Sequence, residues 1–204
     1  MANQKTRRGL IENSKIKMQK SKLQLKNQNW PQVELGAVLK YEQPTKYIVK
    51  STIYSDKYAT SVLTAGKTFV LGNTNEKDNI FPVERLPVII FDDFTTDIKF
   101  VDFPFKVKSS AMKILHPNKN RANANFLFYR MQLIEINHAT HKRYWISEYS
   151  KIKILLPPLA EQARVVARLE GLLAKIKEAR ELNVKTASDL KTLEQSFLSQ
   201  AFGA

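Results

Sequence analysis

The residues best suited to catalysis form a short acidic segment near the middle of the chain. Asp92 and Asp93 are followed by Asp97 and Lys99, in the order acid…Asp-x-Lys that metal-dependent nucleases use. In such enzymes two carboxylates hold Mg²⁺ and the lysine steadies the attacking water. An Asp-x-Lys triplet also arises by chance, so a stand-alone nuclease that uses Asp92, Asp97 and Lys99 is our alternative hypothesis.

Other catalytic or cofactor-binding patterns are weak. His138 and His141 have a spacing seen in metal sites, but no cysteine and no obvious third ligand accompany them. The chain has only six glycines, whereas a cofactor-binding methyltransferase needs a Gly-rich turn of the dinucleotide-binding type. We therefore expect no bound metal and no cofactor.

Polar and basic side chains that suit contacts with DNA lie in three segments. Short amides pair with adenine, lysine pairs with guanine or phosphate, hydroxyls pair with phosphate, and cations beside aromatic residues can grip the DNA backbone. The candidates are Lys67, Thr68, Asn73, Thr74, Asn75, Lys106, Lys108, Ser109, Lys142, Arg143 and Tyr144. We expect residues 72–75 to form a turn, and alternation places Lys106 and Lys108 on one strand face. Ordinary turn chemistry, a solvated strand face and an anchored loop would explain the same segments without DNA.

The charge distribution favours a polyanionic partner. Lysine and arginine number 33 against 19 acids, for a net charge of +14. Residues 1–28 have eight basic side chains and one acid, residues 29–159 have 18 and 12, and residues 160–204 have seven and six. The excess thus lies in the first two parts, where nucleic acid is the expected partner. A solvated basic surface without a partner is the plainer interpretation.

The composition is that of a folded protein with an appendage. A hydrophobic fraction of 43% supports a core, and no segment approaches the ~18–20 consecutive apolar residues of a membrane span. The absence of cysteine is compatible with a reducing cytoplasm, where we place the chain. We expect a basic flexible arm at residues 1–28, a recognition domain at 29–159 and a long helix at 160–204.

The domain is expected to be α/β, with mixed strands and short helices. Segments rich in β-branched and aromatic residues predict strands, separated by Asn, Asp, Gly and Pro. They cover residues 47–49, 61–63, 68–71, 88–91 and 98–103, with a last strand at 152–156. Residues 123–136 predict one helix, because Leu127, Met131 and Ile134 share a face.

Residues 160–202 predict one long helix with a coiled-coil seam. The run contains no proline, and its apolar positions step by four and three residues, which is the 3.5-residue repeat of paired helices. The seam comprises Leu169, Leu172, Ile176, Ala179, Asn183, Thr186, Leu190, Leu193 and Phe197. A helix folded back onto its own domain is the alternative.

The junction between domain and helix resembles that of Type I restriction–modification specificity subunits. The resemblance rests on residues 142–147, the strand at 152–154, and residues 156–166 with their Pro-Pro and Glu-Gln pairs. Residues 63–68, 91–96 and 105–111 are similar to one class of recognition domains in that family, and residues 197–202 resemble the close of its spacer helix. The resemblance therefore covers residues 30–204.

The resemblance implies an adaptor and not an enzyme. Such subunits recognise a bipartite duplex DNA sequence and direct separate modification (methyltransferase) and restriction (nuclease) subunits to it. They usually contain two recognition domains and two spacer helices, whereas this sequence has one of each. It is then a half-subunit or a fragment, and a second copy or second half-subunit is expected to pair with it through the long helix.

Overall fold

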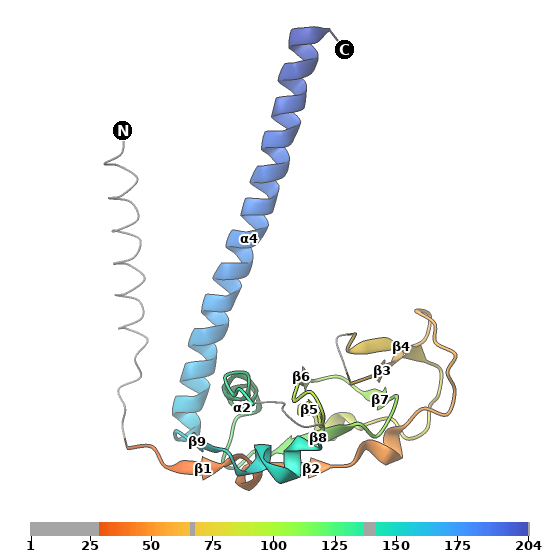
Figure 1. Cartoon of the computed structure of the whole chain (residues 1–204), viewed down its shortest axis with the longest axis vertical. Helices are drawn as coiled ribbons and strands as arrows, with labels where there is room; N and C mark the ends of the chain where they lie inside the picture. Colours follow the sequence, from red (N-terminus) through yellow and green to blue (C-terminus); the bar gives the residue numbers. More distant parts are fainter. Residues whose placement is uncertain (1–28, 66–67, 137–141, 204) are drawn as a thin grey trace.

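The computed structural model describes residues 29–65, 68–136 and 142–203. Figure 1 shows a sheet-rich domain from which one long helix, α4 (Leu159–Phe202), projects, so that the end of the helix lies far from the domain. The predicted α/β domain followed by one long helix is therefore confirmed. The predicted arm at residues 1–28 lies outside the described residues.

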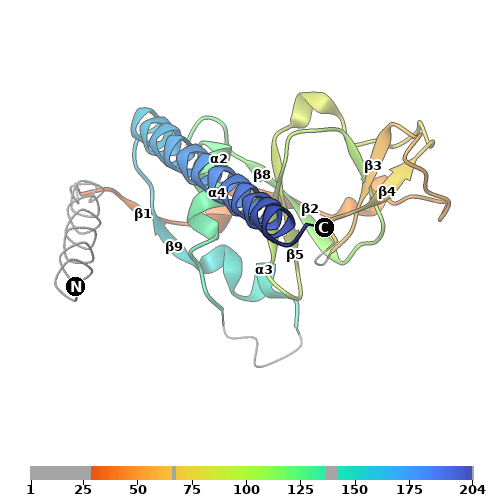
Figure 2. The ribbon, with the colours of Figure 1, turned by 90° about the horizontal axis from the view of Figure 1, so that it is seen from above.

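Three small sheets build the domain. A two-stranded sheet pairs β1 (Gln32–Glu34) with β9 (Lys153–Leu155). A four-stranded antiparallel sheet has the order β2 (Leu39–Glu42), β8 (Met112–Pro117), β5 (Val88–Asp92) and β6 (Ile98–Val101). A three-stranded sheet has the order β4 (Val70–Thr74), β3 (Thr60–Leu63) and β7 (Phe105–Val107), with β3 and β7 parallel. Figure 2 shows this third sheet and the β1–β9 pair at opposite ends of the domain.

Short helical segments connect the strands. The α-helices are α2 (Ala124–Met131) and α3 (Tyr144–Ser147), and the 3-10 helices are η1 (Leu35–Ala37), η2 (Pro44–Tyr47), η3 (Val83–Arg85) and η4 (Tyr149–Lys151). No helix among the described residues is long and apolar enough to cross a membrane.

Strand β5 separates two hydrophobic cores. All five of its residues are buried, and successive side chains point to opposite faces of the sheet. Ile89 and Phe91 pack into a core with α2, α3 and the base of α4. Val88 and Ile90 pack into a second core against the three-stranded sheet. This continuous apolar run is the reason why β5 was predictable from the sequence.

The base of α4 is fixed to the domain by a buried glutamine. The Gln162 side chain accepts a hydrogen bond from the Asn123 backbone N at 2.7 Å. It donates to the carbonyl oxygens of Pro157 at 2.7 Å and Arg121 at 3.0 Å. Gln162 and Val166 are the buried residues of α4, and Glu170 still accepts hydrogen bonds from Asn125 and Tyr129 of α2. The helix therefore leaves the domain after about three turns instead of folding back along it.

Three predicted elements differ from the structure. The helix predicted at residues 123–136 spans only Ala124–Met131, with Asn123 as its N-cap accepting from the Phe126 backbone N at 3.0 Å. The strand predicted at residues 47–49 does not form, because Pro44 begins the helical turn η2, which includes Tyr47, and Ile48 makes only an isolated bridge with Val107. Residues 72–74 belong to β4 and pair with β3, so the turn predicted at residues 72–75 is wrong.

Candidate nucleic-acid interface

The segments that follow β3, β5 and β7 meet at one edge of the domain. Lys108 donates its backbone N–H to Leu63 at 2.8 Å, which joins the end of β7 to the end of β3. Asp93, directly after β5, donates to Ala111 at 3.2 Å and accepts from Tyr144 at 2.9 Å. We call this surface, formed by residues 64–65, 68–69, 93–97, 108–111 and 142–143, the loop edge.

Two cations of the loop edge are available to a polyanion. Lys108 Nζ lies 5.9 Å from the centroid of the Tyr54 ring, and Arg143 Cζ lies 5.9 Å from that of Phe94. Within the part of the chain that the structure describes, neither cation forms an ion pair with a carboxylate. An aromatic ring orients a cation and leaves its charge uncancelled, so this edge suits phosphate or guanine.

Other predicted contact residues also lie at the loop edge. Thr68 is exposed and Ser109 is half-buried, with the Ser109 hydroxyl accepting from the Ala111 backbone N at 3.4 Å. Lys142 forms an ion pair with Glu148, and that hydrogen bond raises the pKa of Lys142. Its charge is therefore balanced locally, in contrast to Lys108 and Arg143. Lys67 lies outside the described residues.

Three predicted contact residues are buried, which corrects the prediction for them. Lys106 is fully buried, and its Nζ lies 2.9 Å from Glu76 Oε2 and donates to the Asp78 carbonyl at 2.8 Å. Thr74 and Tyr144 are each 1% exposed. Strand alternation correctly predicted that Lys106 and Phe105 lie on opposite faces of β7. However, residues 76–78 cover the face with Lys106, which was expected to be accessible.

Two predicted asparagines lie away from the loop edge. Asn73 is in β4 and its Oδ1 accepts from the Ser61 hydroxyl at 3.1 Å. Asn75 is exposed, but it follows the end of β4 that is opposite to the loop edge. Sequence reasoning missed Tyr54 and Phe94, the two rings that orient the free cations. No local signal marks Tyr54, because it meets Lys108 only through the tertiary fold.

The acidic segment considered for a nuclease has structural roles. Asp92 Oδ1 accepts from the backbone N of Phe94 at 2.9 Å and of Thr95 at 3.3 Å, which closes the turn after β5. Asp93 is buried, forms an ion pair with Lys113 at 3.1 Å and accepts from the Trp145 backbone N at 2.9 Å.

No cluster of metal-binding side chains supports the nuclease hypothesis. Asp97 and Lys99 are exposed. In the described residues, no group of three His, Asp or Glu side chains could hold a metal ion. The arrangement thus gives the nuclease alternative no support, and His138 and His141 lie outside the residues that the structure describes.

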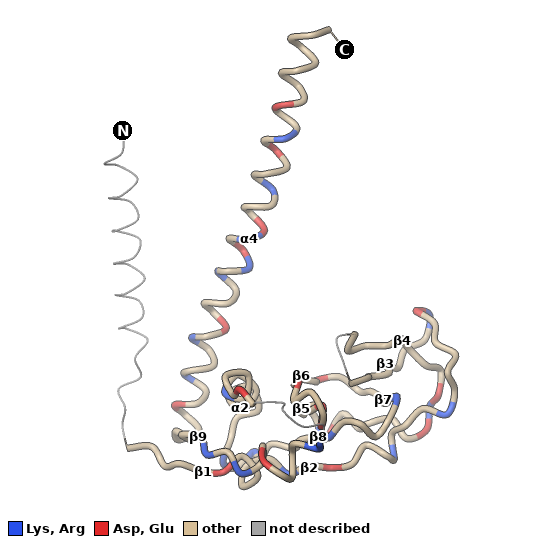
Figure 3. Tube along the Cα trace, in the orientation of Figure 1, with Lys and Arg blue, Asp and Glu red and all other residues tan. Residues whose placement is uncertain are grey.

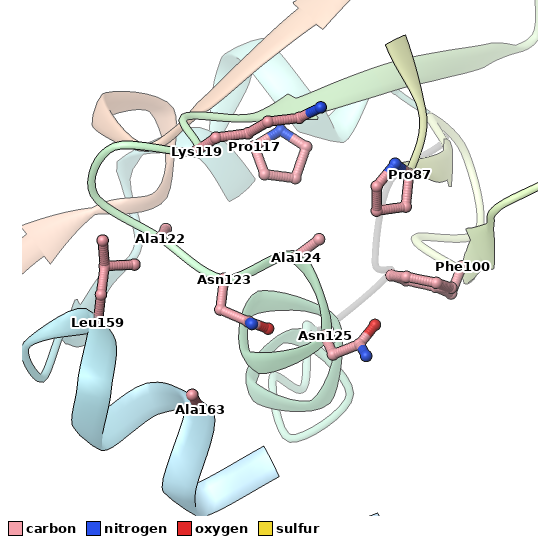
Figure 4. Close-up of a pocket in the computed structure, with 10 residues that line it drawn as sticks. All are labelled: Pro87, Phe100, Pro117, Lys119, Ala122, Asn123, Ala124, Asn125, Leu159 and Ala163. Carbon is pink, nitrogen blue, oxygen red and sulfur yellow. The ribbon is translucent and has the colours of Figure 1, made fainter. Parts of the chain in front are cut away.

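A cavity of about 530 Å³ lies between the start of α2 and the first turns of α4 (Figure 4). Its walls are mostly apolar, and its polar side chains already have partners within the fold. Lys119 Nζ donates to the Leu86 carbonyl at 3.2 Å, Asn125 Nδ2 donates to Glu170 at 3.2 Å, and Asn123 caps α2. This cavity is a feature of the helix attachment, and we assign no ligand to it.

The charge distribution along the helix differs from that of the domain. Figure 3 shows basic and acidic residues interleaved along α4, in agreement with its seven cations and six acids. The excess of positive charge therefore lies in the domain and not in the helix, while the helix presents exposed apolar side chains. A basic domain fits a polyanionic partner, and a projecting helix with exposed apolar side chains fits a second chain.

The chain belongs to the Type I restriction modification DNA specificity domain family, whose model matches residues 27–186. It is 46% identical over 162 residues to the Type I restriction enzyme EcoR124I/EcoR124II specificity subunit of Escherichia coli, an alignment that covers 74% of this chain and 40% of that protein. The family resemblance inferred from the sequence is therefore confirmed.

Solved structures share the fold. One solved structure is described as the structural basis underlying complex assembly and conformational transition of the type I R-M system. The match covers 97% of this chain and 54% of the chain in that structure, with a TM-score of 0.64 and 17% sequence identity. The match to the HsdS subunit from Thermoanaerobacter tengcongensis covers 86% of this chain and 45% of that subunit, with a TM-score of 0.56 and 18% sequence identity. The chain spans about half the length of these relatives, or less.

Proposed function

We propose that this chain recognises a specific sequence in duplex DNA as one half of a Type I restriction–modification specificity subunit, and that it performs no chemistry itself. The loop edge is the observation that supports this proposal most directly. It gathers Lys108 and Arg143 from distant parts of the sequence, and among the residues that the structure describes neither cation forms an ion pair. Family membership supports the same function.

At the loop edge each residue type has a distinct role. Arg143 presents a planar guanidinium that can pair with two acceptors of a guanine or of a phosphate. Lys108, Ser109 and Thr68 suit phosphate contacts, which set orientation without sequence preference. Lys67 and Lys142 remain proposed contacts of second rank, whereas Asn75 is not retained because it follows the opposite end of β4. The basic residues of the arm at 1–28 add non-specific attraction.

A binding measurement on purified full-length chain tests the proposal. The target would be selected from a pool of random duplexes, and the affinity measured by fluorescence anisotropy at several salt concentrations. Lys108→Ala is expected to reduce the log–log salt slope by about 0.9, the value for one lost phosphate contact. Arg143→Ala is expected to lower the preference for the target about 10- to 100-fold, as for a lost bidentate base contact of about 1–3 kcal/mol.

The matched control is Lys40→Ala. Lys40 is an exposed lysine on β2 and pairs with His116, at the end of β8 remote from the loop edge. The substitution removes one positive charge from another face of the domain. The preference for the target sequence and the salt slope of DNA binding should therefore stay near those of the wild type. Equal effects of the three substitutions would show that net charge alone binds DNA and would refute the assignment of the loop edge.

The proposed partners follow from the family. The E. coli relative is named as a specificity subunit of a Type I restriction enzyme. We propose that this chain likewise assembles with a modification subunit and a restriction subunit in the cytoplasm, without a membrane partner. Mixed with a modification subunit and a methyl donor, it should direct methylation to one defined sequence.

Pairing through α4 completes the proposal. From Ile176 onward the seam has no cover, with Ile176 48%, Leu190 62% and Phe197 60% exposed. Two copies packed antiparallel around the midpoint between residues 183 and 186 place Asn183 opposite the partner's Thr186. This polar pair fixes the register, because a slip of one heptad in either direction would place each polar residue against an apolar one.

Antiparallel pairing holds two recognition domains at opposite ends of a rod. At about 1.5 Å per residue, the 44 residues of α4 span about 66 Å. The DNA target is then bipartite, and palindromic when the two copies are identical. Oxidising a mixture of Ile176→Cys and Leu193→Cys chains should cross-link the two variants. Efficient cross-linking of Ile176→Cys to itself would indicate a parallel pair and refute this arrangement.

A further inference from the structure

The short helix α3 lacks a cap from its own N-cap residue. That residue is Arg143, and its side chain forms no capping hydrogen bond. Helices usually begin at Ser, Thr, Asp or Asn, because such a side chain accepts from one of the first backbone N–H groups. Helix α2 follows this rule, since the Asn123 side chain accepts from the Phe126 backbone N at 3.0 Å. The first N–H groups of α3 therefore require an acceptor from another part of the fold.

Asp93, directly after β5, provides that acceptor. Its carbonyl oxygen accepts from the Tyr144 backbone N at 2.9 Å, and its Oδ1 accepts from the Trp145 backbone N at 2.9 Å. Tyr144 and Trp145 are the first two residues of α3 and are each 1% exposed. A buried N–H group without an acceptor is costly. Asp93 thus caps α3 in place of Arg143.

The negative charge of Asp93 is balanced inside the domain by Lys113. Lys113 lies on β8, opposite Phe91 of β5, and its Nζ lies 3.1 Å from Asp93 Oδ2. Both side chains are buried, and a buried charge requires such a partner. Because Lys113 pairs with the second carboxylate oxygen, Asp93 holds the backbone of α3 without also pairing with the Arg143 guanidinium.

The aromatic ring beside Arg143 is fixed by the neighbouring aspartate. Asp92 Oδ1 accepts from the Phe94 backbone N at 2.9 Å, and the Phe94 ring centroid lies 5.9 Å from Arg143 Cζ. Asp92 therefore holds the turn that contains the ring, while Asp93 holds the backbone next to the cation. Arg143 is exposed and, in the part of the chain that the structure describes, it has no carboxylate partner.

We propose that Asp93 is the positioning residue for Arg143, and that this frees position 143 from a structural role, so that its side chain sets which base is recognised. The inference rests on the proposed function, in which Arg143 contacts DNA. A guanidinium pairs with two acceptors only in a defined orientation, and holding it in that orientation before binding lowers the entropic cost of recognition. Asp93 therefore contributes to sequence preference without touching DNA.

Two double variants of the full-length chain test the inference. Both contain Lys113→Met, which removes the buried cation and keeps an unbranched side chain beside the Tyr41 ring, whose centroid lies 5.5 Å from Lys113 Nζ. The first variant adds Asp93→Asn, whose amide oxygen can still accept from Trp145. The second adds Asp93→Leu, a side chain of similar size without an acceptor. Both variants keep the net charge of the wild type, and they differ from each other in the cap alone.

DNA binding of the two variants is measured by fluorescence anisotropy, after circular dichroism has shown that both are folded. The variant with Asp93→Asn should keep its preference for the target within a few-fold of wild type. The variant with Asp93→Leu should lose preference about 10- to 100-fold, as expected for Arg143→Ala. The salt slope should be the same in both, because no cation of the loop edge is removed. Equal preferences in the two folded variants would overturn the inference.

A second variant without the acceptor guards against poor accommodation of leucine. Asp93→Ala combined with Lys113→Met removes the capping oxygen without adding bulk. Its preference for the target should fall by the same factor as in the leucine variant. Preference near wild type in this variant would also overturn the inference.

Adding Arg143→Ala to each double variant shows whether Asp93 acts through Arg143. With Asp93→Asn, it should lower the preference about 10- to 100-fold, as in the wild type. With Asp93→Leu, it should change the preference by no more than a few-fold, because both substitutions remove the same contribution. The full loss in both backgrounds would mean that Asp93 affects binding only through general stability, and the inference would fail.

The single variant Arg143→Ala separates this inference from the proposed function. Unchanged preference in this variant would refute the proposed base contact and the inference with it. Lowered preference in Arg143→Ala, together with near-wild-type preference in the double variant with Asp93→Leu, would leave the base contact intact and overturn only the role of Asp93.

Discussion

Lys106 and Lys108 are two residues apart in the sequence, yet the structure gives them opposite roles. Lys106 is fully buried and its partner Glu76 is 12% exposed. Removing one member of a buried ion pair costs about 3–5 kcal/mol. Glu76 also accepts hydrogen bonds from the backbone N of Lys50 at 2.8 Å and Ser51 at 2.9 Å, which persist in the variant. We therefore expect Lys106→Met to destabilise the fold by about 3 kcal/mol.

Lys108→Met is the matched variant, because it removes the same charge next to the same strand. The Lys108 side chain forms a cation–π contact with Tyr54 and, among the described residues, no ion pair. Such a contact is worth about 0.5–1 kcal/mol at an accessible site. Urea unfolding and thermal unfolding, both followed by tryptophan fluorescence, measure the two losses of stability. The melting temperature should fall on the order of 10 °C for Lys106→Met and by only a few degrees for Lys108→Met.

DNA binding should show the reverse order. Measured at a temperature where both variants are folded, the salt slope should fall by about 0.9 for Lys108→Met and stay unchanged for Lys106→Met. A stable Lys106→Met variant with a reduced slope would mean that Lys106 contacts phosphate. That result would refute the structural role deduced from its burial.

Further predictions concern pH, the helix and catalysis. The hydrogen bond from Lys106 lowers the pKa of Glu76. The stability that this pair contributes is therefore present above the ordinary glutamate pKa of about 4.3 and is lost as the pH falls through the lowered pKa. The Lys106→Met variant should lack this pH-dependent loss of stability in acid unfolding. Asn183→Leu should keep or tighten the dimer but permit several registers, whereas Ile176→Asp should abolish the dimer in sedimentation experiments. The chain alone, with DNA, Mg²⁺ and a methyl donor, should neither cut nor methylate, and cleavage that is lost in Asp97→Asn would favour the nuclease hypothesis.

The sequence alone determined the features whose causes are local. The apolar run of β5 and the proline-free heptads of α4 specify a buried strand and a long helix without reference to the rest of the chain. The Pro-Pro and Glu-Gln junction led to the family, and the structure adds its physical reason, since Gln162 ties three backbone groups to the start of the helix.

The tertiary structure decided which polar residues face solvent. Lys106, Thr74 and Tyr144 belong to residue types that are usually at least partly exposed, and nothing near them in the sequence indicates burial. Lys106, for example, is buried because residues 76–78, which are distant in the sequence, cover it in the fold. The length of α2 was also decided by the tertiary structure. The apolar spacing of the sequence continues beyond Met131, but the helix ends there.

The loop edge likewise exists only in three dimensions. Lys108 and Arg143 are 35 residues apart in sequence, and the rings that support them, Tyr54 and Phe94, come from two further segments. Backbone hydrogen bonds between the ends of β3, β5 and β7 bring these segments together. Periodicity and composition report the neighbours of a residue along the chain, whereas a binding surface depends on which strand ends meet, and that is set by sheet order and register.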